Sequence, residues 1–229
     1  MLSEIFVVRT LIVLLTVLVL TFLGVVYLLS ALNHSLSYPS IAISDAYETD
    51  PTRAIANFLI SVSAYLFVLI VAARLIRLYP FVYRERDMWL LFLIILSLVV
   101  GFLGLMGLAA VPISVQRTLH LVAALMFFLG VGFLVILSIL LDESINMSAP
   151  SWLRRTRIAL GVVLVGLGIA LAIVVELTDA PTGILEICLV LAGLVYIGTW
   201  MHESEFPIKS ETLPARMSSP LIERSVPPL

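Results

Sequence analysis

The sequence predicts an all-α fold, an integral membrane bundle of six transmembrane helices. Of its 229 residues, 62% are hydrophobic and only 12% are charged, whereas a soluble domain carries about a quarter charged residues. The hydrophobic residues are grouped into six blocks, each close to the length of about 20 residues that a helix needs to cross a bilayer. The formal net charge of −2 and the lack of a basic stripe argue against a nucleic-acid partner and leave membrane lipids as the expected surroundings.

The first apolar block, residues 5–32, is predicted to be a retained span rather than a cleaved signal peptide. The apolar core of a signal peptide has about 7–15 residues, but the segment from Thr10 to Leu29 is apolar almost without interruption. The second to sixth spans are predicted at Ala54–Leu78, Met88–Val111, Arg117–Leu141, Ile158–Leu177 and Gly183–Trp200.

The basic residues predict the orientation of these spans. Eleven of the 13 Lys and Arg side chains flank one side of the predicted bundle, and only Arg53 and Arg117 flank the other. Because cytoplasmic loops carry the excess of basic residues, we expect both termini in the cytoplasm. Residues 33–53, 112–116 and 178–182 would then face the lumen of an endomembrane compartment or the exterior of the plasma membrane.

The C-terminal segment differs in kind from the rest of the chain. We expect a six-helix domain over residues 1–201 and a cytoplasmic tail over 202–229. The tail is rich in proline and serine and has no apolar period, so it is predicted to be disordered alone. A protein partner that orders the tail is one possibility left open.

Small and polar residues within the spans are predicted to serve helix packing. Ser97/Gly101, Gly166/Ala170 and Gly168/Ala172 have the spacing of close helix contacts, and Gly101, Gly104 and Gly107 form a stripe along the third span. Asn57, Ser61 and Tyr65 share one face of the second span, which we expect to point into the bundle and to form hydrogen bonds between helices.

Ionisable side chains at membrane depth are costly and usually have a partner or a function. Several are expected to meet on the predicted lumenal face: Asp45, Glu48, Asp50, Arg53, Arg117, His120, Glu176, Asp179 and Glu186. Arg117 and His120 are three residues apart, hence on one helical face. The sequence therefore predicts a polar pocket on this side. The alternative is that Arg117 pairs with Glu176 or Glu186 only to neutralise charge.

Several kinds of chemistry have no counterpart in the sequence. The three histidines lie in separate segments, and Cys188 is the single cysteine, so neither a zinc site nor an intramolecular disulfide is expected. The phosphate-binding GxxxxGK[ST] loop and the GxSxG nucleophile motif are also missing. We therefore expect no metal and no cofactor.

Three short motifs resemble one family of six-span membrane proteins. Ile43-Ser44-Asp45, followed by Pro51 and Phe58, is similar to the family's entry into the second span. His120, followed by Ala123-Ala124 and Phe127-Phe128, is similar to its fourth span. Glu186-Ile187-Cys188-Leu189, with Tyr196 and Thr199, is similar to its last span.

The family is that of the damage-regulated autophagy modulators (DRAM), with its relatives in GPI-anchor lipid remodelling and the N-terminal domain of Cwh-type cell-wall proteins. The chain departs from the pattern in having Asp50-Pro51-Thr52 in place of Pro-Pro-Glu, and Ile187 in place of tryptophan. The resemblance implies an endomembrane protein linked to lipid handling or autophagy. It makes Ser44, Asp45, His120 and Glu186 the matching positions.

Four functional hypotheses follow. The leading one is a non-catalytic membrane protein whose polar pocket binds a lipid headgroup or a partner helix through Ser44, Asp45, Arg117, His120, Glu176 and Glu186. The second is a lipid-remodelling enzyme of the acyl-transfer type, with His120 as general base oriented by Glu186. The third is a proton- or ion-coupled transporter that uses Glu176, Glu186 and His120. The fourth is a structural subunit of a larger membrane complex.

Overall fold

The structure, a computed structural model, describes residues 2–32, 43, 51–145, 149–177 and 182–205. Within these residues the long helices are α1 (Leu2–Leu32), α3 (Thr52–Leu78), α4 (Glu85–Ala110), α5 (Arg117–Ser144), α6 (Ser151–Leu177) and α7 (Gly183–Gly198). Two 3₁₀ turns, η1 (Tyr79–Phe81) and η2 (Thr199–Glu205), continue α3 and α7. Six helices are long and apolar enough to cross a membrane. The predicted all-helical, six-span bundle is therefore confirmed.

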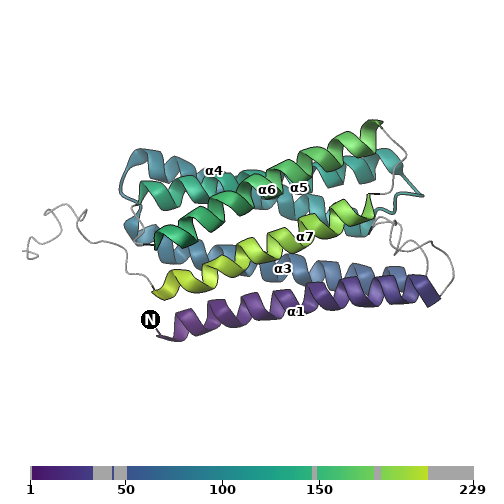
Figure 1. The fold of residues 1–229 in the computed structure, drawn as a ribbon, viewed down its shortest axis with the longest axis horizontal. Coiled ribbons are helices and arrows are strands. Elements are labelled where there is room, and N and C mark those ends of the chain that lie inside the picture. Colours follow the sequence, from purple (N-terminus) through teal and green to yellow (C-terminus); the bar gives the residue numbers. More distant parts are fainter. Residues whose placement is uncertain (1, 33–42, 44–50, 146–148, 178–181, 206–229) are drawn as a thin grey trace, which may run out of the picture.

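The helices run side by side along one axis (Figure 1). In chain order α1 packs on α3, α3 on α4, α4 on α5, α5 on α6 and α6 on α7, and α7 returns to α1. Figure 1 shows α7 between the α1–α3 pair and the group formed by α4, α5 and α6. We call the end that holds the N-terminus of α1, η1 and η2 the basic end. The opposite end, with residues 111–116 and the start of α7, is the loop end.

The outer surface of the bundle is apolar, as a lipid-facing surface must be. Phe6, Phe58 and Val162 are 71%, 66% and 68% exposed. The interior is filled by leucine, isoleucine and valine from all six helices, and Ile70, Leu78 and Ile94 are fully buried there.

Helices α4 and α5 approach each other at backbone distance, and the predicted glycine stripe causes this. A Cβ atom added to Gly104 would lie 2.3 Å from the backbone nitrogen of Phe127, and one added to Gly130 would lie 2.3 Å from the backbone nitrogen of Gly101. Real side chains cannot occupy that space. The packing role predicted for Gly101 and Gly104 is therefore confirmed. In α6, by contrast, a Cβ on Gly166 or Gly168 would meet nothing within 4 Å, so these two glycines are not at a helix contact.

Other expectations need correction. Tyr65 is 59% exposed, and its ring lies against that of Phe102 at an interplanar angle of 59° instead of pointing into the bundle. Helix α6 begins at Ser151 rather than Ile158, because its polar first turns are held by contacts at the basic end that hydropathy does not reveal. The turn η2 extends to Glu205, and the division into two parts at residue 201 stays a prediction. The predicted tail beyond it, residues 206–229, lies outside the described residues.

Candidate functional site

The predicted pocket residues that the structure describes lie at the loop end. His120 is in the first turn of α5, Glu186 is in the first turn of α7, and Arg117 is the first residue of α5. Glu176 is in the last turn of α6, but its side chain is outside the described part of the chain. Ser44 and Asp45 also lie outside it.

His120 connects the start of α5 to the end of α4. Its side chain is only 4% exposed, and its Nδ1 lies 2.7 Å from the carbonyl oxygen of Val111. Because a carbonyl oxygen can only accept, Nδ1 must carry the hydrogen and donate it. The histidine therefore satisfies one of the carbonyl groups that the end of α4 leaves without a helical partner.

Glu186 binds a residue that is far from it in the chain, Ile43. Its carboxylate accepts a hydrogen bond from the Thr182 hydroxyl at 2.9 Å and one from the backbone N–H of Ile43 at 2.7 Å. A carboxylate in the first turn of a helix is also favoured by the helix dipole. The half-buried Glu186 thus positions Ile43, which packs on the apolar cluster at this end.

Within the described part of the loop end, His120 and Glu186 each have hydrogen-bond partners of their own. Among the described side chains, no hydrogen bond joins His120 to Glu186, and Arg117 is exposed with no ion pair. The geometry in which Glu186 orients His120 as a base is not present.

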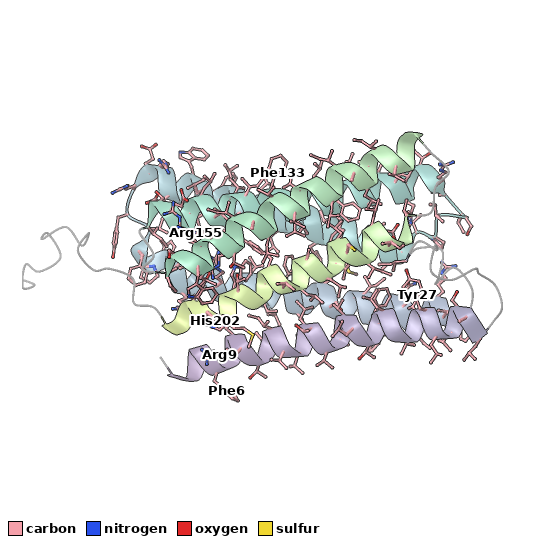
Figure 2. The ribbon with its side chains drawn as sticks, in the orientation of Figure 1. Phe6, Arg9, Tyr27, Phe133, Arg155 and His202 are labelled. Carbon is pink, nitrogen blue, oxygen red and sulfur yellow. The ribbon has the colours of Figure 1, made fainter. Side chains whose placement is uncertain are left out.

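A shallow apolar groove lies between α1 and α7. It has a volume of about 470 Å³ and is formed where the last turns of α1 face α7. Its lining consists of Leu23, Gly24, Tyr27, Leu28, Ala31 and Ile187. Figure 2 places Tyr27 at the loop end of α1. Ile187 directly follows Glu186 in the chain, so the groove reaches the start of α7.

The basic end contains a buried charge network that the sequence analysis missed. Arg74 of α3 contacts Asp142 of α5 at 2.5 Å and Glu203 of η2 at 2.8 Å, and Arg157 of α6 contacts the same two carboxylates at 3.0 and 2.9 Å. Each arginine thus bridges both acids, and the two positive and two negative charges cancel. Arg74, Arg157 and Glu203 are at most 3% exposed.

Further bonds attach η2 and the end of α7 to this network. Arg157 donates to the hydroxyl and the carbonyl oxygen of Thr199, both at 3.0 Å. Arg77 donates to the carbonyl oxygen of Glu203 at 2.7 Å, and Arg9 donates to that of Met201 at 3.1 Å. The guanidinium of Arg74 also lies 4.6 Å from the centre of the Trp200 ring. These contacts join α1, α3, α5 and α6 to the C-terminal end of α7.

The sequence contains a signal for this network. The predicted fifth span begins at Ile158 and so excludes Arg157, whereas both Arg74 and Arg157 are buried. Arg74 lies inside the second predicted span, four residues before its end, and a charge at that depth requires a partner. Asp142 and Glu203 follow the fourth and sixth predicted spans on the same side, and they are the partners.

The six spans and this ring of buried charges define a multi-pass integral membrane protein. A protein-family model described as the Frag1/DRAM/Sfk1/Cwh43P N-terminal domain matches residues 7–204, a range that runs from the second turn of α1 through the other five helices to η2 and includes Glu203. The chain belongs to this family. No curated protein and no solved structure matches the chain.

Proposed function

We propose that the chain is a non-enzymatic membrane protein that binds a phospholipid at its loop end, with an acyl chain in the α1–α7 groove and the headgroup beside Glu186. The observation that carries this proposal is the groove itself. Its lining is apolar, and its volume of about 470 Å³ falls within the usual range of small-molecule sites, about 300–1,000 Å³.

A lipid is the occupant that fits this position. The α1 residues of the groove belong to the candidate membrane span Phe6–Leu32, where acyl chains are the surrounding solvent. The groove leads from apolar Leu23 to the first turn of α7, which carries the half-buried carboxylate of Glu186. An apolar groove near a helix start that carries a polar group suits the amphipathic form of a phospholipid. A partner helix is the competing occupant.

The arrangement of His120 favours binding over acyl transfer. Its Nδ1 donates to Val111, and Glu186 accepts from Thr182 and Ile43. The two groups therefore stabilise the ends of helices, and neither activates the other in the way that a general base requires. Lipid binding agrees with the lipid handling that the family resemblance implies.

Filling the groove tests the proposal. Gly24 lines the groove, and a Cβ added there would meet nothing within 4 Å, so Gly24→Leu is expected to occupy the groove without a clash. The amount of phospholipid that stays with the protein after mild detergent extraction should fall severalfold. Native mass spectrometry measures this as lipid bound per protein chain.

Gly166→Leu is the matched control. Gly166 of α6 is also free of neighbours within 4 Å but lies outside the groove, so this variant should retain lipid as the unmodified chain does. Equal retention in both leucine variants would refute lipid binding in the groove. A partner protein lost from Gly24→Leu, with lipid unchanged, would instead identify a helix as the occupant.

A further inference from the structure

The basic end carries three exposed arginines, Arg84, Arg86 and Arg155, that have no ion-pair partner among the described residues. They differ from Arg74 and Arg157, whose charges are cancelled inside the bundle by Asp142 and Glu203. The three arginines are therefore surplus positive charge on the surface.

Two contacts of the last turn of α5 bring the starts of α4 and α6, which carry these arginines, to the same end of the bundle. Ser144 donates to Asp87 in the first turn of α4, and the adjacent Glu143 pairs with Arg154 in the first turn of α6 at 2.6 Å. Arg84 and Arg86 are within three residues of Asp87, and Arg155 follows Arg154. The starts of α4 and α6 thus both contact the end of α5. Figure 2 shows Arg155 at this end of the molecule.

Aromatic side chains fix the depth of this surface in the bilayer. Trp89, Trp152 and Tyr83 are 60%, 55% and 43% exposed, and each is within five residues of one of the arginines. Exposed tryptophan and tyrosine on membrane helices lie at the level of the lipid headgroups. The arginines beside them are consequently at the depth of the phosphates.

The charges on this surface do not cancel. Arg154 is neutralised by Glu143, and Glu85 is the exposed acidic side chain between Arg84 and Arg86. Three unpaired arginines against one acid leave an excess of positive charge. A guanidinium group donates two parallel hydrogen bonds to phosphate and is less strongly hydrated than an ammonium group, which suits it to a headgroup layer.

We propose that this surface, formed by Arg84, Arg86 and Arg155, binds the phosphate groups of anionic phospholipids in the leaflet at the basic end. The site is at the opposite end of the bundle from the α1–α7 groove and does not depend on it. It recognises headgroup charge, whereas the groove holds an acyl chain.

The test compares the lipids that contact the reconstituted full-length chain. Vesicles of phosphatidylcholine receive a trace of spin-labelled phosphatidylserine or spin-labelled phosphatidylcholine, and electron spin resonance gives the relative association of the two lipids with the protein. We expect the unmodified chain to prefer phosphatidylserine, and this preference to weaken at high salt. In the triple variant Arg84→Gln/Arg86→Gln/Arg155→Gln the preference should fall by at least about fivefold, the effect expected from one arginine near an anionic surface.

Two further variants make the result specific. The triple lysine variant at the same positions keeps the charges and should keep the preference. The double variant Glu143→Gln/Arg154→Gln removes an ion pair from the same surface without changing its net charge, and should also keep it. An unmodified chain without preference, a triple glutamine variant that retains it, or an equal loss in the double variant would overturn the proposal.

Discussion

Replacing Arg74 with glutamine is expected to destabilise the folded bundle by about 3–5 kcal/mol, the usual cost of removing one partner from a buried ion pair. Arg74 contacts both Asp142 and Glu203, and its side chain is 3% exposed. Without it, one positive charge of Arg157 faces two buried carboxylates. Unfolding in detergent micelles, followed by circular dichroism, measures the change in the free energy of unfolding.

The exposed ion pair at the same end provides the control for this prediction. Arg154 and Glu143 are 63% and 39% exposed, and such pairs contribute at most about 1 kcal/mol. Arg154→Gln should therefore have little effect. The double variant Arg74→Gln/Asp142→Asn restores charge balance and should recover part of the lost stability. Similar losses from Arg74→Gln and Arg154→Gln would show that the network does not hold the helices together.

A single methyl group added between α4 and α5 should destabilise the folded bundle nearly as much as Arg74→Gln does. In Gly104→Ala the new Cβ would lie 2.3 Å from the backbone nitrogen of Phe127 and 2.7 Å from the carbonyl oxygen of Ala123. Backbone atoms cannot rotate away as a side chain can, so the two helices must separate along their whole contact. We expect a loss of about 3 kcal/mol, at the upper end of the usual cost of overpacking.

Gly132→Ala controls for the intrinsic effect of the substitution. Gly132 belongs to α5, but a Cβ there would meet nothing within 4 Å. The free energy of unfolding of this variant should be unchanged or slightly higher, since alanine stabilises a helix by up to about 1 kcal/mol relative to glycine. The same unfolding measurement compares the two variants. If Gly132→Ala lost as much stability as Gly104→Ala, the close approach of the backbones would not be the cause.

Hydropathy and glycine spacing predicted the spans and the α4–α5 contact because both signals are local. A helix of about 20 apolar residues is stable when it spans the bilayer. Gly101 and Gly104 mark the face of α4 that a neighbouring helix approaches. The gathering of His120 and Glu186 at one end also followed from topology alone. These features depend on position along the chain and not on how each helix is rotated.

The partners of the polar side chains were not predictable in this way. His120 donates a hydrogen bond to the carbonyl oxygen of Val111, and Glu186 accepts one from the N–H of Ile43. Both partners are backbone groups, so the residue types in the sequence do not identify them. The network of Arg74 and Arg157 requires that four segments meet with their faces turned toward one another. The sequence places these charges at the same end but does not specify the rotation that pairs them.

Photochemical crosslinking of a bound lipid tests the central proposal most directly. The full-length chain is reconstituted with a phospholipid that carries a diazirine in one acyl chain, washed with mild detergent to remove surrounding lipid, and irradiated. Mass spectrometry then locates the labelled residues. Lipid binding in the groove predicts labels concentrated on residues 23–31 of α1 and on Ile187 of α7. Labels spread evenly over equally exposed apolar residues of other helices, such as Phe92 and Val162, would contradict it.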